Sequence, residues 1–284
     1  MKKKTIICPI KYRHGYLKVK PLTTIIVGIK CLDGVVVASD SQSEFGRGVD
    51  VKRLNANKIT TFDSRYIFAG AGILAHIRTL VENVTFYIQN QEAQQRSQLN
   101  KDEAEKVAEQ ALWALVKHYH VDRSNVLGVT DREYFTPITI FAGRHIAENS
   151  VNYYMYFLHG ADGTVEPVDD YGAAGSGAAY AELLLKSLYS ENIMVDEGIK
   201  VGIYIIEEVK SIDPHCGGDT QVAVLKTISQ SEPQVSLRIL NKTEIDTILR
   251  EVKPKLDLVR TELVTKILKG DLDENKIRGI TGSS

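Results

Sequence analysis

Short runs of β-branched and apolar residues recur along the chain, several of them in pairs separated by a turn signal. Such runs predict β-strands, and two runs joined by a short turn predict a hairpin. The first pair is joined by Leu32-Asp33-Gly34 and the second by Asp63-Ser64-Arg65. The predicted strands cover residues 24–30, 35–40, 58–62, 66–69, 136–142, 153–158, 164–168, 221–226 and 234–240.

Between the groups of strands, apolar residues recur at the spacing of an amphipathic helix. The predicted helices cover residues 73–88, 102–118, 178–189 and 195–209. We expect the polar stretch 89–100 to be a loop or a frayed helix end, and the glycine-rich stretch 172–177 to interrupt regular structure. A last amphipathic helix opens with Asn241-Lys242-Thr243-Glu244, which is close to a capping box, and is expected to break or kink at Pro254.

The order of these elements is strands, two helices, strands, two helices and strands. Helices grouped in pairs between antiparallel hairpins favour an α+β fold with sheets inside and helices outside. Residues 1–23 are basic and lack periodicity, so we interpret them as an N-terminal extension. Residues 24–240 are the predicted globular domain, and residues 241–284 are a helical C-terminal extension.

The composition limits the classes of partner. With 36 acidic and 35 basic residues, the net charge gives no reason to expect nucleic acid or an anionic membrane as the main partner. No apolar stretch approaches the roughly 20 residues that cross a bilayer. The cysteines, Cys8, Cys31 and Cys216, are too few and too scattered for a disulfide framework, which favours a reducing cytoplasm.

Common catalytic motifs do not occur in the sequence, which has no P-loop, nucleophile elbow, dinucleotide fingerprint or paired zinc ligands. The remaining candidates for catalytic residues are small polar and charged residues at the ends of predicted strands. Thr24 opens the first strand, Asp40 closes the second and Lys58 opens the third. The alternative to a role in catalysis for Asp40 and Lys58 is an ordinary surface ion pair.

Residues 24–40 read Thr-Ile-Ile-Val-Gly-Ile-Lys-Cys-Leu-Asp-Gly-Val-Val-Val-Ala-Ser-Asp and strongly resemble the opening of proteasome-family subunits. Three later blocks recur in the order that this family uses. They are Ala173-Ala174-Gly175-Ser176-Gly177, Val195-Asp196-Glu197-Gly198 and Asp213-Pro214-His215-Cys216-Gly217-Gly218. The resemblance covers about residues 23–228, and the ordered blocks make it more specific than any single motif.

Resemblance to β-type proteasome subunits implies a four-layer α-β-β-α sandwich of two antiparallel sheets flanked by helix pairs. It also implies a peptidase assembled in stacked rings that enclose the active sites. Carried onto this sequence, the nucleophile is Thr24 and its neighbours are Asp40 and Lys58. The supporting residues that the resemblance implies are Ser176, Asp213 and Cys216, the last standing where many members have serine.

A threonine hydroxyl is a weak nucleophile at neutral pH and needs a base to take its proton. The free α-amino group of a chain-terminal Thr24, with an ordinary pKa of about 7.7 to 8.0, is such a base. Lys58 adds a positive charge that lowers the pKa of both the hydroxyl and the amine, and Asp40 fixes that charge. Backbone N–H groups at Gly70-Ala71-Gly72 are expected to hold the oxyanion of the tetrahedral intermediate.

The amine of Thr24 exists only if the preceding peptide bond is cut, so residues 1–23 are predicted to be a propeptide. Thr23 is a competing nucleophile, although the spacing to Gly28 and Asp40 favours Thr24.

Three functions follow. The first is a cofactor-free, metal-free threonine-type endopeptidase that cleaves unfolded polypeptide in a homo-oligomeric cytoplasmic ring, with a regulator or an ATPase as a candidate partner. The second is a non-catalytic structural subunit of such a ring, because Pro21-Leu22-Thr23 stand where active members usually carry glycine or only an initiator methionine. The third is an N-terminal-nucleophile amidase or transpeptidase.

Overall fold

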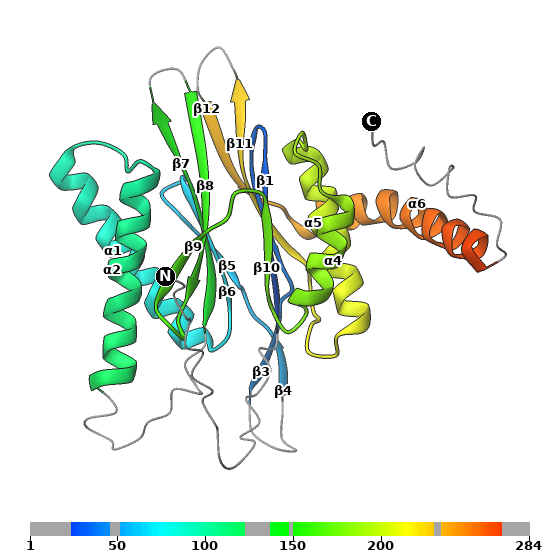
Figure 1. Cartoon of the computed structure of the whole chain (residues 1–284), viewed down its shortest axis with the longest axis horizontal. Coiled ribbons are helices and arrows are strands. Elements are labelled where there is room, and N and C mark those ends of the chain that lie inside the picture. Colours follow the sequence, from blue (N-terminus) through cyan, green and yellow to red (C-terminus); the bar gives the residue numbers. More distant parts are fainter. Residues whose placement is uncertain (1–23, 46–51, 123–136, 148–149, 230–233, 269–284) are drawn as a thin grey trace, which may run out of the picture.

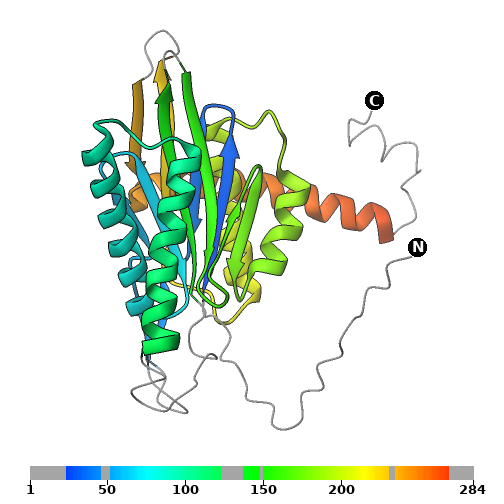
Figure 2. The same cartoon turned by 60° about the vertical axis from the view of Figure 1, so that its left-hand side comes forward.

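Two β-sheets lie face to face in the centre of the molecule, and helices cover both outer faces (Figure 1). The computed structural model describes residues 24–45, 52–122, 137–147, 150–229 and 234–268. Helices α1 (Leu74–Gln95) and α2 (Lys101–Val116) cover one sheet, while α4 (Ala178–Leu188) and α5 (Val195–Ile212) cover the other (Figure 2). The expected α+β fold, a four-layer α-β-β-α sandwich, is therefore confirmed.

Both central sheets are antiparallel and five-stranded. The first has the order β10-β1-β2-β11-β12, with β1 at Ile25–Cys31, β2 at Gly34–Ser39, β10 at Tyr171–Gly175, β11 at Gln221–Ser229 and β12 at Gln234–Ile239. The second has the order β5-β6-β7-β8-β9, with β5 at Ile59–Phe62, β6 at Tyr66–Ala71, β7 at Ile138–Ala147, β8 at Ser150–His159 and β9 at Thr164–Pro167. A small separate sheet pairs β3 (Gln42–Phe45) with β4 (Lys52–Asn55).

The central strands are buried on both faces, which explains their near-continuous apolar runs. In β1, Ile25, Val27 and Ile29 pack beneath α4 and α5, whereas Ile26 packs between the two sheets. Tyr66 of β6 packs beneath α1 and α2. Each sheet therefore contributes to two hydrophobic layers, and the strand ends, where polar residues occur, are left to form a site.

Helix α1 continues to Gln95, so the expectation of a loop or a frayed helix end is wrong for residues 89–95. Glu92 holds this end of the helix. Its carboxylate accepts hydrogen bonds from Nη1 and Nη2 of Arg65 at 2.6 and 2.7 Å and from the hydroxyl of Tyr66 at 2.9 Å. A polar side chain thus anchors the last turns to the sheet, a contact that apolar periodicity does not reveal.

Strand β10 extends through residues 172–175 of the glycine-rich stretch, so the expected interruption of regular structure is wrong for this part of it. The small residues of this strand fit a position where neighbouring side chains leave little space. A Cβ on Gly172 would lie 2.4 Å from a ring carbon of Phe157, because this strand approaches the second sheet closely. The β3–β4 pair is a further element that the sequence patterns did not predict.

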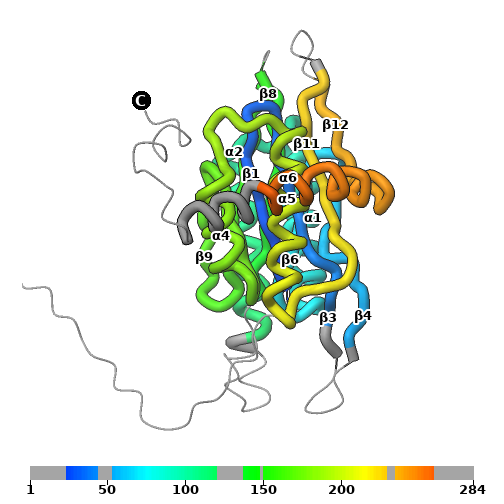
Figure 3. The backbone as a smooth tube through the Cα atoms, turned by 90° about the vertical axis from the view of Figure 1, so that its right-hand side faces the viewer, coloured from blue at the N-terminus to red at the C-terminus, as the bar shows by residue number. Residues whose placement is uncertain are grey.

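The C-terminal helix α6 (Lys242–Leu268) begins with the predicted capping box. Asn241 Oδ1 accepts the N–H of Glu244 at 3.0 Å, and the Glu244 carboxylate accepts the N–H of Asn241 at 2.8 Å. The first turns pack on α5 through the buried Ile245. The helix continues through Pro254 rather than ending there. It projects away from the sandwich in Figure 1, and from that side it crosses in front of α5 (Figure 3). Among the described helices, none has the length and apolarity that crossing a membrane requires.

Candidate active site

Three strand ends bring Thr24, Asp40 and Lys58 together. Thr24 comes immediately before β1 and Asp40 immediately after β2. These strands are antiparallel, with Ile26 opposite Ser39, so the two ends lie at the same edge of the first sheet. Lys58 comes immediately before β5 of the facing sheet. Both sheets therefore contribute to the same polar cluster.

The carboxylate of Asp40 is the centre of this cluster and is completely buried. Its Oδ1 accepts the hydroxyl of Thr24 at 3.1 Å, the backbone N–H of Ile25 at 3.1 Å and Lys58 Nζ at 2.7 Å. A buried carboxylate loses its hydration and needs several donors to offset that loss. These donors fix one face of the carboxylate towards Thr24.

The other oxygen of Asp40 is held by backbone groups. Oδ2 accepts the N–H of Gln42 at 3.2 Å and the N–H of Gly217 at 3.0 Å. The Gly217 carbonyl in turn accepts the N–H groups of Ser41 and Gln42 at 3.2 and 2.9 Å. The loop after α5 is therefore tied to the end of β2, and it prevents the Asp40 carboxylate from rotating.

Lys58 brings its side-chain nitrogen into contact with the Thr24 hydroxyl. Its Nζ donates to Thr24 Oγ1 and forms an ion pair with Asp40 Oδ1 at 2.7 Å. The side chains of Lys58 and Asp40 are only 6% and 0% exposed, so the interpretation as a surface ion pair is wrong. Burial lowers the pKa of Lys58, although the Asp40 carboxylate acts in the opposite direction by favouring the charged amine.

A second polar network lies beside the Thr24 backbone. Ser176 Oγ donates to the Thr24 carbonyl oxygen at 3.3 Å and lies 3.5 Å from Cys216 Sγ. The Cys216 thiol donates to Asp213 Oδ2 at 3.4 Å, and the backbone N–H of His215 donates to Asp213 Oδ1 at 2.9 Å. The three residues expected to support Thr24 therefore form one connected network.

The protonation of this network follows from its surroundings. Burial raises the pKa of Cys216 to about 12, and the carboxylates of Asp40 and Asp213 act in the same direction. Burial would also raise the pKa of Asp213, but hydrogen bonding from Ser176 and from the His215 backbone outweighs it and lowers that pKa. At neutral pH Asp213 is therefore an anion and Cys216 an uncharged donor.

Gly175 allows the backbone of Thr24 to pass close to the end of β10. It has a φ of 112°, and a Cβ at this position would lie 2.1 Å from the Thr24 carbonyl oxygen. We expect Gly175→Ala to reduce the free energy of unfolding by more than about 1 kcal/mol, because the new methyl group must displace Thr24 as well as tolerate a left-handed conformation.

Thermal unfolding of the Gly175→Ala variant checks this expectation, with Gly163→Ala as the matched control. Gly163 also has a positive φ, 77°, but a Cβ there would meet nothing closer than 3.7 Å. The control therefore carries the backbone strain without the collision. Equal decreases in Tm for the two variants would show that the close approach to Thr24 contributes nothing.

Comparison with known proteins fits this arrangement. The family model for proteasome subunits matches residues 22–112 and 147–225. The proteasome subunit beta 1 of Thermococcus onnurineus is 31% identical over 238 residues, which is 82% of this chain and 98% of that protein. The chain belongs to the proteasome subunit family.

Other relatives agree on the type of subunit. The proteasome subunit beta of Nanoarchaeum equitans is 30% identical over 178 residues, covering 63% of this chain and 80% of that protein. The proteasome subunit beta 1 of Thermococcus sibiricus is 28% identical over 235 residues, covering 83% and 98% respectively. The chain is therefore a β-type proteasome subunit, and membership of this family makes it part of a multi-subunit ring.

In this β-type subunit, the residues expected to hold the oxyanion are not a free turn. Gly70 and Ala71 lie within β6, and the N–H of Gly70 already donates to the Lys58 carbonyl oxygen at 3.2 Å. Gly72 follows the end of the strand with a φ of 124°. The Gly70 N–H is therefore already used within the sheet, and the oxyanion role of Ala71 and Gly72 stays a prediction.

Two glutamines near the site were missed by the sequence analysis. Gln42 Nε2 donates to the carbonyl oxygen of Pro214 at 3.3 Å, and the amide of Gln221 bonds to the backbone on both sides of Asn57. Neither glutamine belongs to a motif, so no signal in a single sequence distinguishes them. Thr23, the competing nucleophile, lies outside the described residues, and its role stays a prediction.

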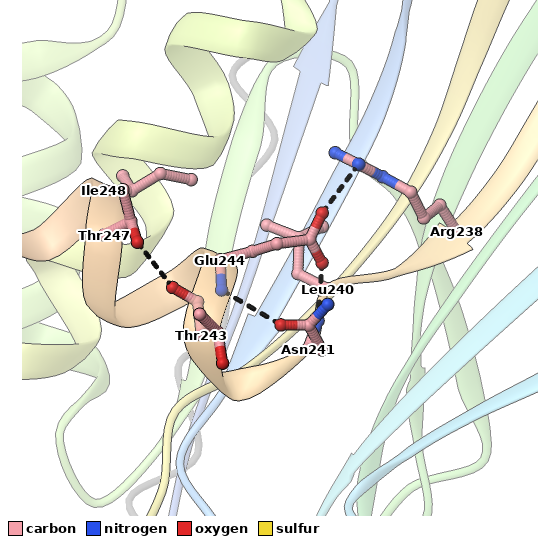
Figure 4. A pocket seen from close by; sticks show the side chains of 7 residues that line it. All are labelled: Arg238, Leu240, Asn241, Thr243, Glu244, Thr247 and Ile248. Atoms are coloured by element: carbon pink, nitrogen blue, oxygen red, sulfur yellow. Dashed lines mark hydrogen bonds and ion pairs between the residues drawn. The ribbon is translucent and has the colours of Figure 1, made fainter.

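A separate open pocket of about 360 Å³ lies where β12 meets α6 (Figure 4). Leu240 and Ile248 are among its apolar lining residues, and Arg238 and Glu244 line it as an ion pair with a separation of 2.9 Å. None of the lining residues belongs to the Thr24 site. Because its two charged residues neutralise each other, this pocket gives no basis for assigning a ligand.

Proposed function

We propose that this subunit is a threonine-type endopeptidase whose nucleophile is Oγ1 of Thr24. The observation that carries the proposal is the position of this oxygen, which is hydrogen-bonded to both Lys58 Nζ and Asp40 Oδ1 in a buried site. The family model for proteasome subunits supports it, because the matched segment 22–112 contains all three residues.

Activation requires a cut between Thr23 and Thr24. In the uncut chain the Thr24 nitrogen is an amide and not a base, so the Oγ1 proton passes first to the uncharged form of the Lys58 amine, which burial favours by lowering the pKa of Lys58. Oγ1 attacks the Thr23 carbonyl carbon, the Thr24 nitrogen leaves with a proton, and residues 1–23 remain attached as an ester. Water hydrolyses that ester, which leaves a carboxylate on Thr23 and restores the Thr24 hydroxyl beside a free amine.

Peptide hydrolysis then uses the freed amine of Thr24 as the base. The amine takes the Oγ1 proton as the oxygen attacks the substrate carbonyl, and the proton passes to the leaving amine. Water hydrolyses the resulting acyl-threonine ester. Lys58 lowers the pKa of the hydroxyl and amine, Asp40 holds Lys58, Ser176 holds the Thr24 carbonyl, and Gly72 donates to the oxyanion.

The same proposal includes the assembly and the substrate. The ring consists of copies of this chain, acts on unfolded polypeptide without a cofactor, and receives its substrate from a regulator or an ATPase. Enclosure in a ring suits a reaction that would otherwise damage folded proteins in the same compartment, because only unfolded chains can enter.

Hydrolysis of fluorogenic peptides and of an unfolded protein by the purified, assembled subunit tests the proposal. We expect turnover of both substrates once residues 1–23 have been released. An assembled ring that retains residues 1–23 and cleaves neither substrate would identify a non-catalytic structural subunit. Cleavage of small amides without cleavage of peptides would identify an amidase instead.

A further inference from the structure

A side-chain amide holds the backbone segment that carries Lys58. Gln221 is the first residue of β11, and its amide reaches the segment before β5. Its Oε1 accepts the N–H of Lys58 at 2.9 Å, and its Nε2 donates to the carbonyl oxygen of Ala56 at 2.8 Å. One amide therefore bonds to both residues that flank Asn57, as the peptide group of an adjacent strand would.

The position of Lys58 at a sheet edge makes this amide important. Strand β5 is the outermost strand of its sheet, so the sheet itself bonds only one side of the segment. On that side the Lys58 carbonyl oxygen accepts the N–H of Gly70 at 3.2 Å. The Lys58 N–H donates to Gln221 Oε1, which comes from the facing sheet. The backbone of Lys58 is therefore bonded to both sheets.

The amide also connects the two halves of the site. Gln221 lies opposite Ser39 of β2, next to Asp40, in the sheet that carries Thr24. Lys58 belongs to the facing sheet. The two bonds of Gln221 therefore join the sheets at the point where Lys58 Nζ must meet Thr24 Oγ1.

We propose that Gln221 is a positioning residue of the active site, which sets the place of Lys58 relative to Thr24 by tying the two sheets together. The inference rests on the proposed peptidase function, and the two bonds of Gln221 go to backbone groups rather than to the reacting atoms. A misplacement of about 1 Å in a catalytic group costs up to about 10²-fold in rate. Loss of the amide bonds is therefore expected to reduce turnover more than substrate binding.

Loss of the Gln221 amide is expected to change the pKa of Lys58 in a defined direction. The titratable groups that face the Lys58 amine are Asp40, after β2, and Cys216, in the loop after α5. Loosening the segment hydrates Lys58, so its pKa rises towards the ordinary value of 10.5. Its charge also moves away from Thr24, and the pKa of the Thr24 amine then rises. The acid limb of the pH–rate profile is therefore expected to move to higher pH.

Kinetics of the assembled, processed subunit test the proposal with three variants. Gln221→Leu keeps the size but removes both bonds, and Gln221→Glu keeps the acceptor for the Lys58 N–H but loses the donor to Ala56. Gln95→Leu is the matched control, because its exposed amide donates only to Glu103 at 3.0 Å, on the surface of α1 and α2. We expect kcat to fall by about 10-fold or more in Gln221→Leu, with KM within about twofold of wild type.

The order of the variants and the pH profile separate positioning from general destabilisation. Gln221→Glu is expected to retain more of kcat than Gln221→Leu, and Gln95→Leu to match wild type. The acid limb should move to higher pH in Gln221→Leu. A wild-type kcat together with an unshifted acid limb in Gln221→Leu would overturn the proposal, whether or not the Tm of this variant decreases.

A measurement that does not need activity separates this inference from the proposed function. The pKa of Lys58 is followed by NMR of lysine-labelled full-length protein, with the signal assigned through Lys58→Arg. We expect a higher pKa in Gln221→Leu, and Gln221→Met, which also lacks both bonds, serves if the leucine variant does not fold. An unchanged Lys58 pKa would overturn the positioning role. A wild-type ring that hydrolyses no peptide would instead contradict the peptidase function alone.

Discussion

Replacing Thr24 with alanine is expected to abolish peptide hydrolysis and to leave residues 1–23 attached to the assembled subunit. The substitution removes Oγ1, the atom proposed to attack both the Thr23 carbonyl and the substrate. Asp40 and Lys58 remain paired with each other, so we expect the fold and the ring to persist. Removal of a nucleophile typically reduces turnover by about 10⁴-fold or more. Peptide hydrolysis rates and the intact mass of the same preparation measure both effects.

The matched control for this experiment is Thr23→Ala. It changes the neighbouring threonine but leaves Oγ1, Lys58 and Asp40 in place, so we expect cleavage after residue 23 and near wild-type activity. The reverse result, an inactive Thr23→Ala variant and an active Thr24→Ala variant, would transfer the nucleophile to Thr23. Activity in both variants would contradict a threonine mechanism altogether.

Substitution of Asp40 by asparagine is expected to have the second-largest effect, on stability as well as on activity. The Asp40 carboxylate receives the Thr24 hydroxyl, Lys58 Nζ and three backbone N–H groups while completely buried. An asparagine at this position turns one acceptor into a donor and removes the carboxylate that pairs with the buried Lys58 charge. Breaking one partner of a buried pair costs about 3 to 5 kcal/mol, and we expect a large decrease in Tm with at least a 10²-fold loss of turnover.

Two controls distinguish the buried charge from a general effect of the substitution. Asp219→Asn removes the carboxylate of an exposed pair, Asp219 with Lys242 at 2.7 Å, and should change neither Tm nor turnover appreciably. The double variant Asp40→Asn with Lys58→Met should recover part of the lost stability without recovering activity. A wild-type Tm for Asp40→Asn, or full activity in the double variant, would contradict the assigned roles.

The sequence predicts the central hairpins because their residues are buried on both faces. The β-branched runs that become β1 and β2 need no tertiary information to be identified as strands, and the antiparallel hairpin then places Thr24 and Asp40 at one edge. Lys58 is different, since it belongs to the facing sheet. Its place in the site followed from the family resemblance, and the structure supplies the physical reason, which is the packing of the two sheets.

The features that the sequence did not predict depend on polar side chains that act across the fold. Glu92 extends α1 because it receives Arg65 and Tyr66 from elsewhere in the chain. Gln221 reaches Lys58 across the gap between sheets, and no periodicity marks a residue for such a role. Strand β10 was missed because its glycines, including Gly175, are required by close approach rather than by turn formation.

The intact mass of the wild-type subunit, purified from its assembled ring, tests the central claim most directly. We predict a single mass that corresponds to residues 24–284, because only cleavage before Thr24 gives its hydroxyl an amine base on the same residue. The full-length mass in a ring that nevertheless hydrolyses peptides would contradict the claim, since catalysis would then proceed with the Thr24 nitrogen still in an amide bond.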